Sequence, residues 1–414
     1  MVKWTDAQLD AIYYSENKDV LVAAAAGSGK TAVLVERIIQ KIISTENPVS
    51  VDELLVLTFT DPAAREMKSK IAAAVDKKLK EQPDNKHLKQ QSLRVQSADI
   101  STIHSFAKKI IENNIHLTDI PAGFTVVEGA ENEFLLDEAL NSCLEKYYSN
   151  IDKVRPFKEL AAGYGGIKND NTLREQILRL HKFSMSMAQP AKWLNNAADM
   201  YREVSENGTI SGTAWGDVFL SCVHKHAQHI LGYYEIMNEI AEKTFLEDDK
   251  LTVFVKSETE MIKKALSTKT LDEFFNYISG LKFARRPTVR SDDPIISAAV
   301  KSIADIRDTA KKKFTEPRFM RYTSDEEAAE TIKELYPRIK TLKNIVLMLI
   351  RGHRKLKRKN SYLDFNDLEH ELIKLIMNND GTPTEFCKTL GEKYKEILVD
   401  EYQDTNDIQD TIFR

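Results

Sequence analysis

The sequence is poor in the features that assign a protein to a class at a glance. Only three cysteines occur in 414 residues, Cys143, Cys222 and Cys387, and their wide spacing and odd number fit neither a disulfide framework nor a metal motif. No apolar run reaches the length of a membrane span, and the N-terminal residues lack the apolar core of a signal peptide. We therefore expect reduced thiols and a cytoplasmic protein with no membrane segment.

A surplus of basic charge is also missing. The 59 Lys and Arg residues are outnumbered by 63 Asp and Glu residues, which gives a net charge of −4. Since the chain as a whole is not basic, any nucleic-acid site must be a local groove. The hydrophobic share of 42% and the length predict an ordinary globular chain of two or three domains.

Strand and helix patterns alternate at both ends of the chain. Within residues 1–116, apolar runs at 20–22, at 54–57 and near 100 each lead into a helical pattern. Residues 117–355 show helical periodicity with few glycines and prolines, and in residues 356–414 a further apolar run appears at 397–399. We therefore predict an α/β fold, a parallel sheet with helical crossovers, interrupted by a large α-helical insertion domain.

The stretch DVLVAAAAGSGKTAVL at 19–34 predicts a phosphate-binding loop between a strand and a helix. Backbone N–H groups from Ala26 to Gly29, including Gly27 and Ser28, would surround phosphate, and Lys30 would reach the β- and γ-phosphates. The Thr31 hydroxyl would bind Mg²⁺. Ala24 stands where the strict motif has glycine, and the alternative is a strand–helix bend without a ligand.

A second acidic motif follows the apolar run Ile397–Val399. Asp400 and Glu401 come at the carboxyl end of this predicted strand, where ligands of open α/β sheets gather. Asp400 suits Mg²⁺ coordination and Glu401 suits orientation of the attacking water. A solvated turn is the alternative for such a pair taken alone.

Taken in order, four stretches resemble the N-terminal motifs of superfamily 1 DNA helicases of the UvrD/Rep type. They are AAAGSGKT at 24–31, TFTDPAAREM at 58–67, STIHSF at 101–106 and LVDEYQDT at 398–405. TDAQ at 5–8 is similar to the Q motif of this superfamily, and YLDFNDLEH at 362–370 to the segment before its motif II. The size of the insertion and the DFNDLEH stretch look most like the AddA (RexA) helicase–nuclease subunits, with RecB-like and UvrD-like subunits as alternatives.

The resemblance implies a P-loop NTPase (RecA-like) fold with ATP and Mg²⁺ as cofactors. It also implies single-stranded and double-stranded DNA as partners, an AddB-like (RexB-like) partner subunit, and a role in double-strand-break repair and recombination. By resemblance, Gln8 reads the adenine edge and Gln403 senses the γ-phosphate and couples it to DNA. The residues implied to line the single-strand channel are Thr58, Phe59, Thr60, Thr102 and His104.

Each of these DNA assignments has a structural alternative. Phe59 and Phe106 could instead be core residues under the sheet, and His104 a hydrogen-bonded structural histidine. Asp61 replaces the asparagine usual at its motif position, and we expect it to cap the following helix instead of contacting DNA. The basic run RGHRKLKRK at 351–359 is expected to be a solvated helix face, with DNA contact as the alternative.

The sequence stops about a dozen residues after the acidic motif, at Arg414. The resemblance implies that a second RecA-like domain with arginine fingers, and in AddA a nuclease domain, should follow. We therefore expect a fragment that binds Mg-ATP weakly and hydrolyses little of it. A non-catalytic ATP-dependent DNA-binding or assembly module is the alternative, whereas a P-loop kinase or small GTPase would explain neither TFTDPAAREM nor LVDEYQDT.

Overall fold

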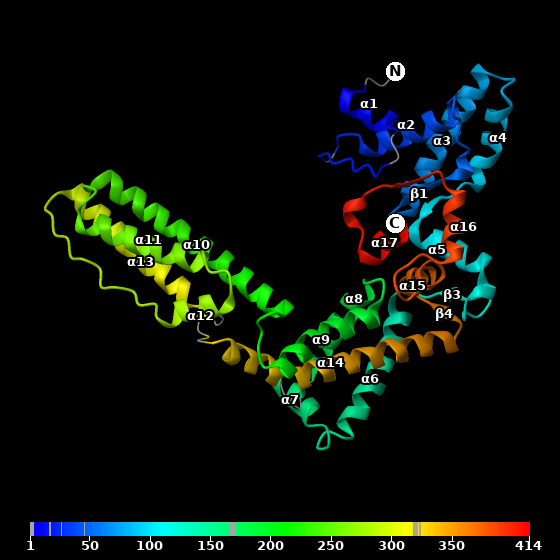
Figure 1. Cartoon of the computed structure of the whole chain (residues 1–414). Coiled ribbons are helices and arrows are strands. Elements are labelled where there is room, and N and C mark those ends of the chain that lie inside the picture. Colours follow the sequence, from blue (N-terminus) through cyan, green and yellow to red (C-terminus); the bar gives the residue numbers. More distant parts are fainter. Residues whose placement is uncertain are drawn as a thin grey trace. The chain divides into compact units, whose positions relative to one another are not determined.

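The computed structural model describes residues 4–15, 18–25, 27–44, 46–164, 170–317, 322 and 324–414. Two compact units are present (Figure 1). The first, the sheet unit, comprises Met1–Tyr148, Arg174–Ala191 and Val346–Arg414. The second, the helical unit, comprises Ser149–Leu173 and Lys192–Ile345. In the described ranges, no helix combines the length and the apolar character that crossing a membrane requires.

A three-stranded parallel sheet organises the sheet unit. Its order is β2 (Ile100–Thr102), β1 (Leu54–Thr58) and β5 (Glu396–Val399). The central strand pairs Val56 with both Ile100 and Leu398, and all five of its residues are buried. A strand covered on both faces needs a continuous apolar run, as the sequence LLVL provides. The three strands end at the same edge of the sheet, where the candidate site lies.

The two faces of β1 bury alternate side chains in different cores. Leu55 and Leu57 pack with α5 (Ile103–Asn113), α15 (Phe365–Ile376) and α17 (Asp407–Phe413). Leu54 and Val56 pack with α2 (Lys30–Ile43) and α3 (Asp61–Glu81). The remaining elements of this unit are α1 (Asp6–Tyr13), η1 (Val51–Glu53), α4 (Lys86–Arg94), η2 (Val95–Ser97), η3 (Ile115–Leu117), β3 (Thr125–Val126), α6 (Gly129–Tyr148), β4 (Tyr362–Leu363), α16 (Glu385–Lys393) and η5 (Tyr402–Asp404).

The strand predicted at 20–22 is not formed. Val20, Leu21 and Val22 have no regular secondary structure and are 47%, 76% and 45% exposed. A strand needs a neighbour that accepts and donates its ladder hydrogen bonds, and the described residues supply none for this segment. On the outer edge of the sheet, β5 likewise has no further strand among the described residues, and Ile397 is 42% exposed.

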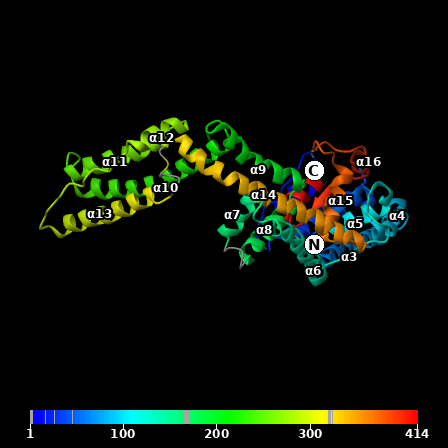
Figure 2. The ribbon, with the colours of Figure 1, turned by 90° about the horizontal axis from the view of Figure 1, so that it is seen from below.

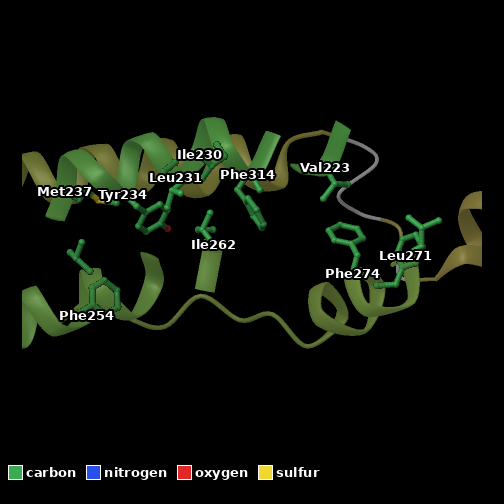
Figure 3. Packing of buried hydrophobic residues seen from close by; sticks show 14 of the residues in the cluster. Val223, Ile230, Leu231, Tyr234, Met237, Phe254, Ile262, Leu271, Phe274 and Phe314 are labelled. Carbon is green, nitrogen blue, oxygen red and sulfur yellow. The ribbon is translucent and has the colours of Figure 1, made fainter. Parts of the chain in front are cut away.

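Helices alone make up the described part of the helical unit. α10 (Ala214–Thr244), α11 (Lys250–Leu266) and α13 (Pro294–Thr315) run side by side, with α12 (Leu271–Ser279) after α11 (Figures 1 and 2). Tyr234 and Phe274 are fully buried in the core between these helices (Figure 3). α7 (Arg155–Gly163) also belongs to this unit, and three helices have residues in both units: α8 (Asn171–Met185), α9 (Pro190–Asn207) and α14 (Asp325–Lys359).

Candidate nucleotide and DNA site

The phosphate-loop motif forms a tight turn into the first turn of α2. Gly27 and Gly29 have φ of +78° and +84°, a left-handed conformation that glycine adopts without strain. Gly29 is the N-cap of α2 and Lys30 its first residue, and the first turn contains no acidic side chain. The backbone N–H groups and the positive end of the helix dipole are therefore free of a competing carboxylate in that turn. Ala26 lies outside the described residues.

Lys30 folds back over the loop that precedes it. Its Nζ donates to the carbonyl oxygens of Ala24 at 2.9 Å and Ala25 at 3.3 Å. Because both acceptors are uncharged and exposed, a phosphate group would be a stronger partner for this ammonium. The contact keeps the Lys30 cation at the loop.

Thr31 and Asp400 meet although 369 positions separate them in the sequence. The Thr31 Oγ1 donates to Asp400 Oδ2 at 3.3 Å, and the Asp400 N–H donates to Leu57 O at 2.9 Å, which continues the β1–β5 ladder. Burial, together with the charge of Glu401, raises the pKa of Asp400 above its usual value. A bound cation would offset both causes, so this pair has the donor chemistry that Mg²⁺ prefers.

The described residues hold no group of three or more His, Cys, Asp or Glu side chains arranged to bind a metal. Mg²⁺ commonly binds through one or two protein ligands, with water and substrate phosphates completing its octahedron. The Thr31–Asp400 pair therefore fits Mg²⁺ carried with a nucleotide better than a permanently bound metal ion.

Glu401 has a left-handed backbone conformation, with φ of 55°. This conformation is uncommon for a residue other than glycine and carries some strain. The side chain is exposed, and Gln403 donates from Nε2 to its carboxylate. The two side chains predicted to act on the γ-phosphate side are thus in direct contact.

Gln8 contacts the phosphate loop. Thr5 and Gln8 form a capping box that starts α1, and the Gln8 Nε2 donates to Ser28 O at 3.1 Å. The glutamine therefore lies where one ligand could touch both it and the loop.

A small pocket opens at the carboxyl edge of the sheet. The DNA-channel candidates Thr58, Phe59, Thr102 and His104 line it, together with Leu57, Ile103, Val399, Gln409 and Phe413. Phe59 is 38% exposed and can offer a ring face to a ligand, whereas Phe106 is buried in the core, as the structural alternative for that residue predicts. Thr60 is not among the lining residues.

The threonines of this pocket hold the backbone in shape. The Thr58 hydroxyl donates to Thr60 O at 3.1 Å. Thr102 caps α5 by accepting from the Ser105 N–H, and its own hydroxyl donates to Ser105 Oγ at 2.9 Å. Thr58 and Thr102 are both buried, so their side chains shape the edge of the pocket more than they project from it.

His104 is held by a buried carboxylate. Its Nε2 lies 3.1 Å from Glu369 Oε1, and its ring stacks on Phe365 with centroids 4.5 Å apart. Gln409 donates from Nε2 to the same oxygen at 2.7 Å. Sequence reasoning missed Glu369 and Gln409, although one signal was available: Glu369 shares a helical stripe with the buried Leu372 and Ile376.

Asp61 does not cap α3. Thr60 is the N-cap, with its Oγ1 accepting from the Ala63 N–H at 3.3 Å, and Asp61 is the first helical residue with Pro62 next to it. A threonine hydroxyl reaches the free N–H groups of the first turn as well as a carboxylate does, so the cap moves one residue earlier. Asp61 instead favours the positive end of the helix dipole.

The basic run 351–359 is not simply a solvated helix face. Lys357 is buried and lies 2.6 Å from both Asp364 and Asp367. Arg354 and Arg358 pair with Asp119 and the buried Glu371. The expectation failed because α14 packs its basic side chains against acidic residues that are distant or later in the sequence.

Comparison with known proteins assigns the family. The model of the UvrD/REP helicase N-terminal domain matches residues 4–414. Proteins named as AddA-type subunits of an ATP-dependent helicase/nuclease, from Clostridium beijerinckii, Acetivibrio thermocellus and Staphylococcus epidermidis, are 36%, 36% and 35% identical to this chain over 99% of its length. The match covers 33% of each of them, so the chain spans about a third of the length of these relatives. The chain belongs to the UvrD/REP helicase family and carries its N-terminal domain.

Proposed function

We propose that this chain is the ATP-binding part of an ATP-dependent DNA helicase, the motor subunit of a helicase–nuclease that acts in double-strand-break repair and recombination. The RecA-like domain would comprise residues 1–116 and 356–414, with residues 117–355 as the insertion domain. Its partner would be an AddB-like protein, and its location the cytoplasm. Relatives whose names describe helicase/nuclease subunits support this assignment.

The observation that carries the proposal is the contact between Thr31 and Asp400 beside Lys30. A phosphate loop alone is shared by many proteins, and an Asp-Glu pair alone is common. Their meeting at one edge of a parallel sheet supplies the cation, the hydroxyl and the carboxylate that nucleoside-triphosphate hydrolysis requires.

The roles of the residues follow from their chemistry. Lys30 would bind the β- and γ-phosphates, while Thr31 and Asp400 would hold Mg²⁺, which when bound neutralises charge on the phosphates. Glu401 would accept a proton from the attacking water. Gln403, which donates to Glu401, would sense the γ-phosphate, and Gln8 would hydrogen bond to the adenine base while staying near Ser28.

Single-stranded DNA would bind at the pocket on the same edge. The Phe59 ring can stack on a base, a contact worth about 1–3 kcal/mol. The backbone at Thr58, Thr60 and Thr102 would position phosphates, and His104 would act from the place where Glu369 holds it. DNA and ATP would therefore act on neighbouring strand ends.

Binding of a fluorescent ATP analogue with Mg²⁺ tests the nucleotide site. Because the chain spans about a third of its relatives' length, we expect binding by this chain but little turnover. Lys30→Ala should weaken binding by roughly tenfold or more, as removal of a charged hydrogen bond does. Lys70→Ala is the matched control, since Lys70 is an exposed lysine paired only with Glu66.

Steady-state ATP hydrolysis with and without single-stranded DNA completes the test. Equal nucleotide affinity of the wild type and Lys30→Ala would contradict the proposed site. DNA-stimulated turnover that Lys30→Ala abolishes would mean that this chain, alone or by self-association, completes the catalytic site.

A further inference from the structure

The segment that joins α12 to α13 is strongly basic. Residues 281–290 read LKFARRPTVR and contain four cations and no acidic residue. They form neither helix nor strand, and they run beside the α10–α11–α13 bundle (Figures 1 and 2). We call residues 281–290 the basic strap.

The basic strap is anchored to the bundle by its apolar residues and one backbone contact. Leu281, Phe283 and Val289 pack against the core of the helical unit. Arg307 of α13 donates from Nη2 to Ala284 O at 2.8 Å. Arg307 is itself held by two hydrogen bonds to the buried Glu258, of 2.8 and 2.7 Å, so the strap lies on a fixed support.

Its cations point outward and lack acidic partners. Lys282, Arg285 and Arg290 are exposed, and the described residues give none of them an ion pair. Other lysines of the same bundle are neutralised differently, since each of Lys243, Lys256 and Lys263 has a glutamate partner. The charge of the strap is therefore available to a ligand.

The surroundings add further positive charge. Lys311 lies over the Phe283 ring, 5.3 Å from its centroid, and the exposed Lys312 and Lys313 follow it on α13. The acidic groups nearest in sequence are Asp292 and Asp293, the second of which caps α13, and α13 carries the exposed Asp305 and Asp308. Positive charge still exceeds negative charge over this face.

One further donor of the strap lacks an acceptor. The Arg286 Nη1 is inaccessible to solvent and makes no hydrogen bond within the described residues. Buried donors are rarely left unpaired in the absence of a missing ligand, ion or water. Arg286 therefore gives a second indication that the strap needs an anionic partner.

We propose that the basic strap binds the phosphodiester backbone of nucleic acid. Three of its four cations are arginines, whose planar guanidinium groups match phosphate geometry better than an ammonium does. An extended chain rises about 3.3 Å per residue, so the cations form a linear row. That arrangement suits a regular polyanion and reads no base sequence. The inference rests on the proposed function in that a DNA motor would present this ligand.

Salt-dependent DNA binding tests the proposal. Fluorescence anisotropy would compare a 30-base-pair duplex with a 30-nucleotide single strand over a range of KCl concentrations, both without nucleotide. The test variant combines Lys282→Ser, Arg285→Ser and Arg290→Ser. The control combines Lys243→Ser, Lys256→Ser and Lys263→Ser, which changes the net charge equally on the same bundle.

Loss of three phosphate contacts should lower the slope of log K against log salt by about 3 for duplex DNA or about 2 for a single strand. The control should keep the wild-type slope, and the nucleic acid that shows the larger change is the preferred ligand. Wild-type slopes in the test variant, or no DNA binding by the wild type at low salt, would overturn the proposal. Strap-dependent binding of polyglutamate without DNA binding would also overturn it, in favour of an acidic protein.

These outcomes are independent of the nucleotide site. Failure of Lys30→Ala to affect ATP binding would remove the proposed function, whereas the slope measured without nucleotide reports on the strap alone.

Discussion

Individual residues at the nucleotide site carry unfavourable energy in the free protein. Burial and the charge of Glu401 raise the pKa of Asp400, and Glu401 has a left-handed backbone that costs on the order of 1 kcal/mol. Active sites commonly give up stability in this way, because groups placed to meet a ligand oppose each other without it.

We expect Asp400→Asn to stabilise the free chain. A carboxyl group whose pKa is raised on folding binds more protons in the folded state, so its contribution to the free energy of unfolding falls as pH rises above 3.8. At neutral pH the variant should melt at a higher temperature than the wild type. Because both states are protonated in strong acid, the difference should shrink as pH falls toward 3.8.

Melting curves at several pH values, with and without Mg-ADP, measure this effect. Asp404→Asn, a change at an exposed carboxylate of the same segment, is the control and should leave the melting temperature unchanged. Mg-ADP should stabilise the wild type and lose that effect in Asp400→Asn. Identical melting of the variant and the wild type at every pH would show that Asp400 carries no folding penalty.

The sequence predicted residues whose role is written in a short motif and missed those defined by a distant partner. Lys30, Thr31 and Asp400 could be named because loop, helix start and strand end each leave a local pattern. The contact of His104 with Glu369 could not be read, since 265 positions separate them and no pattern fixes their register. For the same reason, the burial of Lys357 was not visible in a count of charges.

Elements show the same limit. The apolar runs at 20–22 and 54–57 look alike in sequence, yet only the second forms a strand, because only β1 has neighbours on both sides. Helices were easier to predict, since their hydrogen bonds are local: the helix after the phosphate loop begins at Lys30, one residue before the predicted start.

Two glycines of α10 should respond in opposite directions to the same change. A Cβ at Gly216 would lie 2.4 Å from the Ile210 carbonyl oxygen, whereas a Cβ at Gly232 would meet nothing within 4 Å. Gly216→Ala should therefore lower the free energy of unfolding by about 1–3 kcal/mol through overpacking. Gly232→Ala should raise it by up to about 1 kcal/mol through helix propensity.

Urea denaturation followed by circular dichroism compares the two glycine variants directly. Since both sites lie on one helix and receive one methyl group, the Gly232 variant controls for the chemistry of the substitution. Equal effects of the two changes would mean that the backbone around Ile210 yields to the methyl group.

At the scale of the whole molecule, the two units bury charge in different ways. The helical unit buries the Glu258–Arg307 pair, a carboxylate matched by a guanidinium. The sheet unit buries two histidines, and their rings lie 6.2 Å apart. Burial and the nearby Lys357 lower the pKa of His181 to about 4 and that of His353 to about 3, although Asp364 opposes the shift. The units should therefore differ in their response to mild acid.

We expect the sheet unit to lose stability first as pH falls. A histidine whose pKa is lowered on folding is protonated mainly in the unfolded chain, so stability present at neutral pH is lost as pH falls below 6.5. Each histidine should account for about 2 kcal/mol at about pH 5. Hydrogen exchange at pH 7.5 and pH 5, corrected for intrinsic rates, should show α8, α15 and the last turns of α14 losing protection while α10, α11 and α13 keep theirs.

His353→Asn tests the cause of that loss. The variant removes one buried site of protonation and the acceptor or donor that faces Asn132, so it should halve the acid sensitivity of the sheet unit while lowering its stability at neutral pH. His116→Asn changes an exposed histidine of the same unit and should leave the acid response as it is. If both units opened together in the wild type, or if His353→Asn kept the full acid response, the buried histidines would not be the groups that titrate.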